Sequence, residues 1–440
     1  MMIDNRSSLL CRIVGKTAAA ILMLAMTAPA MMAQKYPANY DEDKVPAYVL
    51  EDPLVFQDGR KVKKKDWPAR RAEILDIFQR EMYGQLPPAP SKMVLETLEE
   101  GLTMAGHARR RQVRMWFSDD KTGPCITWLI LTPEKLKGPF PVVLLLNYKG
   151  NHTVLPDEEI LIPDIKLRCK TPASDSPRGM LTDPSNASIL PADMILARGY
   201  ALVTACYEEM SPDPEGGKEP QDKYAYTGIF DLWGKRDPSR KDNTTSLMAW
   251  AWGLMRGMDM LERDPVLDAG KVLLTGYSRL GKAALVAGAY DDRFAVVVPN
   301  QTGGGGAPLT KRHFGENVQT EIHSFTHWYC RAYDKYEDNE AAMPFDQHML
   351  LACVAPRPLM VQGFDKPWFD TKGEFLALKA ASPVWKFLGR PGLPDVEFPE
   401  DYSRAAIGPY LAYYHRDLEH GIAAIDWEWM LDFARPYLDK

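Results

Sequence analysis

The stretch that most constrains the fold of this chain is KVLLTGYSRLGKAALVAGAY, residues 271–290. It opens with a short apolar and β-branched run typical of a buried strand, and helix formers dominate from Arg279 onwards. Only Gly276-Tyr277-Ser278 separates the two elements. A serine at such a corner has its hydroxyl held clear of the sheet, next to the free N–H groups of the helix N-terminus. The stretch therefore predicts a strand followed directly by a helix, with Ser278 as a nucleophile at the turn.

The motif is not a complete Gly-x-Ser-x-Gly. Leu280 stands where the second glycine is expected, and Gly281 follows one residue later. A serine in an ordinary strand-to-helix turn acts as a helix cap, which is the alternative interpretation of Ser278. The choice between nucleophile and cap depends on the rest of the chain.

The other predicted elements indicate an α/β architecture. Residues 95–132 alternate between apolar and polar, which is typical of antiparallel strands, and the run 139–147 is continuously apolar, which is typical of a strand buried on both faces. A further buried strand is predicted at 200–206, and strands at 294–299 and 358–363, with helices at 66–84, 245–263, 314–332 and 427–438. We expect three layers: a mostly parallel central sheet with antiparallel N-terminal edge strands, and helices on both faces.

The first 33 residues resemble a secretory signal peptide. Basic residues precede the apolar run 17–26, and small residues follow it, so that cleavage is expected after Ala30 or Ala33. No later segment is long and apolar enough to span a membrane. We therefore expect an exported protein, periplasmic or secreted, with a single catalytic domain at 34–440.

Composition excludes several classes of function. The formal net charge of -6 leaves no basic excess to neutralise phosphates, which argues against a nucleic-acid partner. The four glycines 303–306 are not followed by the Lys-Ser/Thr pair of a phosphate-binding loop. Five cysteines follow the predicted leader, with no zinc-type spacing, so we expect no metal site and at most one or two disulfides among mostly buried thiols.

A nucleophilic serine requires a histidine as base and an acid that orients it. Ser278 is followed by Asp365, just past a predicted strand, and then by His420, in the loop before the last helix. This order suits a parallel sheet whose strands end at one edge. Asp370 competes with Asp365 as the acid, and His415 competes with His420 as the base.

Two cations lie next to the serine in the sequence. The backbone N–H of Arg279 is the expected oxyanion donor, and its guanidinium would add a charged donor. Lys282 lies one helical turn after Ser278 and so on the same face of the helix. A cation there suits a polyhydroxylated or acidic substrate.

Several motifs together resemble the glucuronoyl esterases, carbohydrate esterase family 15. The similar segments cover most of the chain after the leader: WPARRAEILDIFQREMYG, LNYKGNHTV, GYSRLGK, FGENVQT, APRP and WFDTKGEF. GYSRLGK resembles the family's G-C-S-R-x-G-K, with Tyr277 in place of the cysteine. The resemblance implies an α/β-hydrolase that cleaves esters of 4-O-methyl-glucuronic acid, which join glucuronoxylan to lignin alcohols in plant cell walls.

The resemblance also implies roles for individual residues. Ser278 would be the nucleophile, His420 the base and Arg279 an oxyanion stabiliser, with a second oxyanion contact from the loop 149–151. Lys282, Glu316 and Trp368 would bind the sugar. No metal or organic cofactor is implied. We expect a monomer whose partner is a uronic acid ester of a plant cell-wall polysaccharide.

The chain departs from the family at the triad acid. Many members have a glutamate in a P-x-E-S-G-like stretch, whereas this chain has Gln301 there, so we expect Gln301 to contact substrate and Asp365 to act as the acid. The loops 157–191 and 208–243 also differ from the family. Two rival hypotheses follow: an esterase for another uronate, such as methyl galacturonate in pectin, or a hydrolase-fold carbohydrate-binding protein with impaired catalysis.

Overall fold

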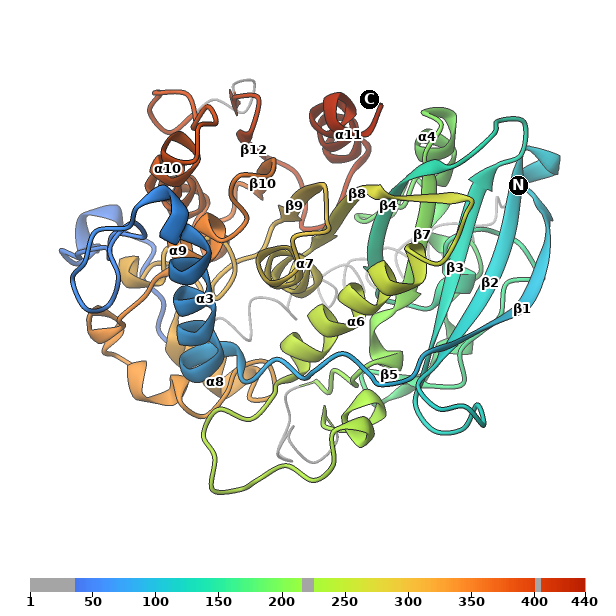
Figure 1. Cartoon of the computed structure of the whole chain (residues 1–440), viewed down its shortest axis with the longest axis horizontal. Helices are drawn as coiled ribbons and strands as arrows, with labels where there is room; N and C mark the ends of the chain where they lie inside the picture. Colours follow the sequence, from blue (N-terminus) through green and yellow to red (C-terminus); the bar gives the residue numbers. More distant parts are fainter. Residues whose placement is uncertain (1–35, 216–224, 400–404, 440) are drawn as a thin grey trace, which may run out of the picture.

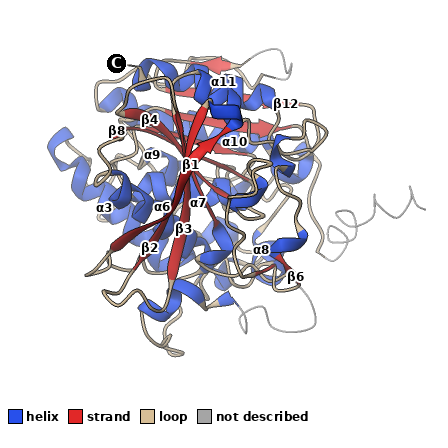
Figure 2. Cartoon of the chain, turned by 90° about the vertical axis from the view of Figure 1, so that its right-hand side faces the viewer, coloured by secondary structure: helices blue, strands red, loops and turns tan. Residues whose placement is uncertain are grey.

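The computed structural model describes residues 36–215, 225–399 and 405–439. The predicted leader, residues 1–33, lies outside the described residues. The described part of the chain is organised around one ten-stranded sheet with helices on both faces (Figure 1). In Figure 2 the strands fan out behind β1, which shows that the sheet is twisted, as L-residues require.

The sheet has the order β1-β2-β3-β7-β4-β8-β9-β10-β12-β11. Its strands are β1 Val94–Thr103, β2 Ala108–Trp116, β3 Cys125–Pro133, β4 Phe140–Asn147, β7 Ala201–Cys206, β8 Leu267–Tyr277, β9 Val296–Asn300, β10 Leu359–Phe364, β11 Ala406–Ile407 and β12 Leu411–Arg416. The pairs from β7 through β12 are parallel, and β1, β2 and β3 are antiparallel, as predicted. The sequence analysis did not predict the short antiparallel strand β11 at the opposite edge.

Helices cover both faces of the sheet. They are α3 Trp67–Phe78, α4 Ala192–Ala197, α6 Ser246–Leu261, α7 Arg279–Tyr290, α8 Val318–Ser324, α9 Gln347–Ala352, α10 Thr371–Phe387 and α11 Ala424–Leu438. α6, α7 and α10 pack on one face, and α4 and α11 on the other (Figure 1). A smaller sheet pairs β5 Lys166–Leu167 with β6 Thr171–Pro172.

The two faces enclose separate hydrophobic cores, and the central strands supply both. In β4, Val142, Leu144 and Leu146 point into the core under α6 and α7. Val143 and Leu145 point into the core under α11. Successive side chains of a strand alternate between its faces, which is why a continuous apolar run predicted a strand buried on both sides.

Two local predictions differ from the structure. The segment 314–332 is helical only over α8, because Asn317 caps that helix and a series of turns follows it. The helix predicted at 66–84 is α-helical only over α3, and it ends in a π turn at Gln79–Tyr83 before Gly84. Helical propensity in these stretches is outweighed by the tertiary contacts of the residues that follow.

Candidate active site

Ser278 lies at the corner between β8 and α7 with φ 56° and ψ -134°. This conformation is sterically unfavourable for a residue with a Cβ, and such strain concentrates at functional sites. The backbone N–H of Ser278 donates to the carbonyl of Asn300 at 2.9 Å, which ties the corner to the end of β9. A plain capping serine has extended backbone and bonds its own helix, and Ser278 makes no side-chain cap bond. The geometry is that of a nucleophile elbow.

The spacing of the two glycines follows from close packing at the corner. A Cβ on Gly276 would lie 2.4 Å from the carbonyl oxygen of Leu280. A Cβ on Gly281 would lie 2.7 Å from the carbonyl oxygen of Asn300, so only glycine lets α7 approach β9 here. The second glycine is therefore required one residue later than in Gly-x-Ser-x-Gly.

The structure brings His420 to this corner. It belongs to the loop between β12 and α11, and its ring centroid lies 5.9 Å from that of Tyr277, the residue before Ser278. Phe364 and Phe369 pack against the same imidazole at 5.2 and 4.7 Å. These rings limit how the imidazole can turn.

The partner of His420 is not the residue expected from the sequence. Its Nδ1 lies 3.0 Å from Oε1 of Gln301, which follows β9. Gln301 is fully buried, so its side chain is directed at the histidine and its loop. We expected Asp365 at this nitrogen and Gln301 at the substrate.

The competing residues are placed elsewhere. Asp365 follows β10, and its backbone N–H donates to the carbonyl of Arg416 at 2.8 Å. Asp370 caps α10 and forms a buried ion pair with Arg312. His415 lies inside β12, not in the following loop, and its Nε2 bonds the carbonyl of Pro399. Asp370 and His415 thus have structural partners of their own.

The surroundings of His420 favour the neutral imidazole. Desolvation, together with the positive charges of Arg279, Arg416 and Lys282, lowers the pKa of His420 to about 4. A histidine that is neutral at physiological pH can accept a proton from a hydroxyl.

Arg279 is held by a buried carboxylate, that of Asp213. The guanidinium donates to Asp213 Oδ2, and the carboxylate is only 1% exposed. Burial alone would raise the pKa of Asp213, but the charge of Arg279 and the hydrogen bond from His327 hold it well below its usual value. The Arg279 side chain remains 18% exposed, so part of its guanidinium still faces the site.

The carboxylate of Asp213 accepts hydrogen bonds from five side chains in different parts of the chain. Besides Arg279, they are Tyr207 at 2.8 Å, His327 at 2.8 Å, Trp328 at 3.0 Å and Arg168 at 3.0 Å. Sequence reasoning missed this residue, because an aspartate in a proline-rich loop gives no signal of its own before the fold is known.

A second charged pair lies one turn along α7. Lys282 Nζ is 3.3 Å from Glu316 Oε2, with side chains 2% and 6% exposed. Trp328 lies between the two cations, 4.9 Å from Lys282 Nζ and 4.8 Å from the guanidinium carbon of Arg279. Trp368 supports this pair, because its carbonyl accepts from the backbone N–H of Glu316 at 2.9 Å. Trp328 was not predicted as a site residue.

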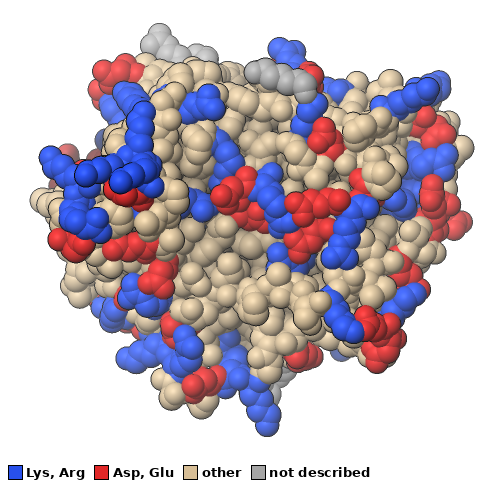
Figure 3. All heavy atoms as spheres, in the orientation of Figure 1, with Lys and Arg blue, Asp and Glu red and all other residues tan. Residues whose placement is uncertain are grey.

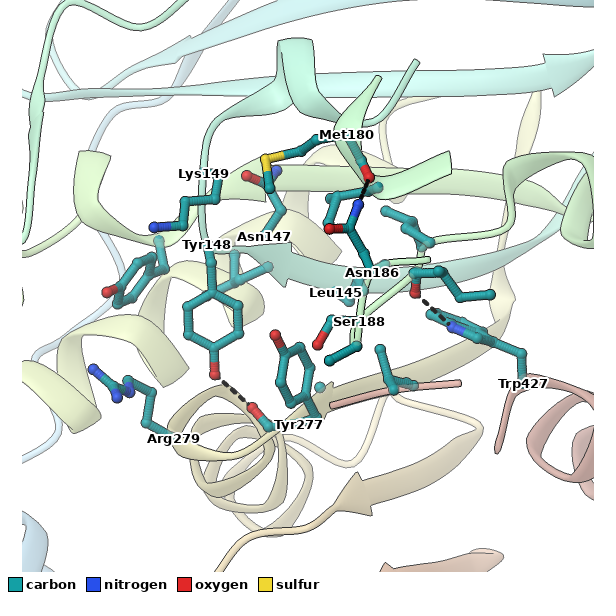
Figure 4. Close-up of a pocket in the computed structure, with 18 of the residues that line it drawn as sticks. Leu145, Asn147, Tyr148, Lys149, Met180, Asn186, Ser188, Tyr277, Arg279 and Trp427 are labelled. Atoms are coloured by element: carbon teal, nitrogen blue, oxygen red, sulfur yellow. Dashed lines mark hydrogen bonds between the residues drawn. The ribbon is translucent and has the colours of Figure 1, made fainter. Parts of the chain in front are cut away.

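A cavity of about 350 Å³ adjoins the elbow (Figure 4). Tyr277 and Arg279, the residues on either side of Ser278, both line it. Most of its wall is aliphatic or aromatic: Leu145, Leu146, Tyr148, Met180, Leu181, Ile189, Leu190, Tyr207, Ile422 and Trp427. The two neighbours of Ser278 thus border a largely apolar cavity.

The surface of the face in Figure 3 carries interspersed acidic and basic side chains. Such a pattern does not form the continuous basic stripe that tracks a phosphate backbone. No described helix is long and apolar enough to cross a membrane. The five described cysteines are all free thiols in the structure.

The chain is similar to known glucuronoyl esterases over most of its length. A family model described as glucuronyl esterase, fungi, matches residues 165–389. A carbohydrate esterase from an unknown prokaryotic organism is 35% identical over 92% of this chain and 93% of its own length. A glucuronoyl esterase from Solibacter usitatus has a TM-score of 0.81 and 37% identity, and the match covers 90% of this chain and 99% of that one. This chain belongs to the glucuronoyl esterase family, carbohydrate esterase family 15.

Membership in the glucuronoyl esterase family makes the protein a carboxylic ester hydrolase with the α/β-hydrolase fold, as predicted. A 4-O-methyl-glucuronoyl methylesterase from Phanerochaete carnosa is a more distant relative, 28% identical over 81% of this chain and 75% of its own length.

Proposed function

We propose that this glucuronoyl esterase hydrolyses 4-O-methyl-glucuronoyl esters that link glucuronoxylan to aromatic alcohols of lignin. The observation that carries the proposal is the strained Ser278 corner with His420 beside it and Arg279 next in the chain. The relatives named 4-O-methyl-glucuronoyl methylesterase support the same acyl group. We further propose that residues 1–33 direct export and that the enzyme acts as a monomer without a cofactor.

In the proposed mechanism His420 Nε2 takes the proton of Ser278 while Oγ attacks the ester carbonyl carbon. The negative charge that develops on the carbonyl oxygen is stabilised by two donors of Arg279: its guanidinium, and its backbone N–H, which at the first residue of α7 has no intrahelical acceptor. Collapse of the intermediate breaks the bond to the alcohol, which leaves with the proton from His420. Water then attacks the acyl-enzyme in the same way and releases the uronic acid.

The charged pair suits the sugar. Lys282 and Glu316 are almost fully buried and present a donor and an acceptor one helical turn from the nucleophile. Paired donors and acceptors of this kind bind sugar hydroxyl groups and give specificity at low exposure to water. The buried ring of Trp328 packs against Lys282 Nζ and helps to hold the lysine in place.

The apolar cavity suits the alcohol. An ester places its acyl and alcohol groups on opposite sides of the reacting carbon, and the cavity is bordered by Tyr277 and Arg279 but not by Lys282 or Glu316. A cavity of roughly 150 Å³ is enough to hold benzene. A volume of about 350 Å³ therefore accommodates a substituted aryl alcohol.

The proposal is tested with benzyl glucuronate, methyl glucuronate and methyl galacturonate. We expect kcat/KM to be highest for benzyl glucuronate, by about 10-fold or more over the methyl ester, because burying an aromatic ring gains several kcal/mol that a methyl group cannot. A preference for the galacturonate would contradict the assignment of the acyl group and favour a pectin esterase. Turnover of none of the three would favour the binding-protein hypothesis.

A second test concerns Arg279. Arg279→Ala is expected to lower kcat by about 10²–10³, since removal of one oxyanion donor has this effect in other serine hydrolases. Arg279→Lys keeps a positive charge, so we expect its kcat to fall less than that of Arg279→Ala. The readout is kcat for methyl glucuronate, and a loss below about tenfold in Arg279→Ala would exclude its side chain from the oxyanion site.

A further inference from the structure

We propose that Gln301 takes the place of the triad acid: its neutral side-chain amide orients His420 and fixes the tautomer in which Nε2 is free to accept a proton. Gln301 is a positioning residue that acts through His420. The inference rests on the proposed function, because it assigns the base that Ser278 requires.

The orientation of the Gln301 amide is determined by its contacts with Gly421. Its Nε2 donates to the Gly421 carbonyl oxygen, and its Oε1 accepts from the Gly421 backbone N–H at 3.2 Å. A carbonyl oxygen only accepts and a backbone N–H only donates, so the amide cannot be flipped without losing both bonds. The oxygen of Gln301 must therefore face His420.

The tautomer of His420 follows from this orientation. Nδ1 lies 3.0 Å from Gln301 Oε1, which has no proton to give, so Nδ1 must carry the proton. In the neutral imidazole the other nitrogen, Nε2, then has the free lone pair. This is the tautomer that a serine base requires, and a carboxylate produces the same one in other triads.

The loop explains why the chain has an amide rather than a glutamate at this position. The Gly421 carbonyl oxygen that accepts from Gln301 also accepts from Arg416 Nη2 at 2.7 Å. A carboxylate at residue 301 would bring a second oxygen against that carbonyl and lose the donor. Arg416 cannot compensate freely, because its Nε is already paired with Asp426. The site is complementary to a side chain that both donates and accepts.

Asp365 is the competing orienter of His420, and the described hydrogen bond of His420 Nδ1 goes to another side chain. The hydrogen-bond partner of that nitrogen is Oε1 of Gln301. The backbone of Asp365 is bound to Arg416 at the end of β10. If Gln301 orients His420, its substitution should disable the base. If Asp365 does so, substitution of Asp365 should have that effect instead.

The test compares three variants on methyl glucuronate: Gln301→Leu, Asp365→Asn and Gln362→Leu. Gln362 is the matched control, a buried glutamine whose amide pairs with Asn300 and with the carbonyl of Asp426. We expect Gln301→Leu to lower kcat by about 10²–10³ with little change in KM, because general base catalysis contributes about this much. For Asp365→Asn and Gln362→Leu we expect a kcat within about tenfold of the wild-type value.

A second readout does not depend on turnover. Long-range ¹H–¹⁵N NMR of the wild-type protein, with His420 assigned by comparison with His420→Gln, is expected to show a proton on Nδ1 and a pyridine-like Nε2. A proton on Nε2 would overturn the proposal. So would a raised KM with unchanged kcat in Gln301→Leu, which would make Gln301 a substrate contact, or a larger loss in Asp365→Asn than in Gln301→Leu. If wild type turns over no uronate ester, the proposed function fails while the NMR result still decides the role of Gln301.

Discussion

Replacing Ser278 with alanine is expected to lower kcat by about 10⁶, as removal of the nucleophile does in other serine hydrolases. The substitution removes one oxygen and keeps the Cβ, so the backbone at φ 56° is no more strained than in wild type. The elbow is also anchored through backbone atoms, by the bond from Ser278 N–H to Asn300. Loss of activity would therefore report the chemistry of the hydroxyl rather than the fold.

The measurement is kcat for methyl glucuronate, together with covalent labelling by a serine-directed phosphonate. Wild type is expected to be labelled once, and Ser278→Ala not at all. Ser382→Ala is a suitable control, because Ser382 lies in α10 and its hydroxyl accepts a hydrogen bond from the backbone N–H of Leu393. Phosphonate labelling of Ser278→Ala, or a kcat above about a tenth of wild type, would mean that another residue is the nucleophile.

Asp213→Ala is expected to destabilise the protein by about 3–5 kcal/mol, because removing one partner of a buried ion pair leaves the other charge uncompensated. Arg279 would lose its carboxylate, and the buried ring nitrogens of His327 and Trp328 would lose their acceptor. Because Arg279 would no longer be held at the elbow, kcat should fall by about 10² as well. For Asp213→Asn we expect a stability and a kcat that lie between those of wild type and those of Asp213→Ala.

Stability is measured by urea unfolding, and kcat at a temperature where each variant is folded. Asp346→Ala is a matched control, since Asp346 is equally buried but accepts from the backbone of Thr310, Lys311 and Gln347. We expect it to lose stability without a comparable loss of kcat. Full activity in folded Asp213→Asn would contradict the idea that Asp213 positions Arg279.

Much of the fold was predictable because its signals are local. The continuous apolar run of β4 and the alternation in β2 and β3 both reflect how a strand alternates its side chains between faces. The elbow was predictable for the same reason, since strand, glycine, serine and helix follow one another without interruption. The predicted helix at 314–332 was wrong over most of its length, because turns stabilised by distant residues interrupt it after α8.

The site was only partly predictable. Ser278, Arg279 and Lys282 lie on one element, so their proximity follows from helical spacing. His420 was predicted from its position after the last parallel strand. Its partner was not, because Gln301 and Asp365 follow neighbouring strands β9 and β10, and both could reach the same edge. Asp213 has no local signal at all.

The sequence by itself determined the strand–elbow–helix unit, the mostly parallel sheet and the family, because these depend on residue spacing along one segment or on whole motifs. Only the tertiary structure decided which carboxylate holds Arg279 and which side chain faces His420 Nδ1. Both choices depend on hydrogen bonds between loops far apart in the chain, such as the 120-residue separation between Gln301 and Gly421. The donor and acceptor pattern of such a contact exists only after the loops have been brought together by the sheet.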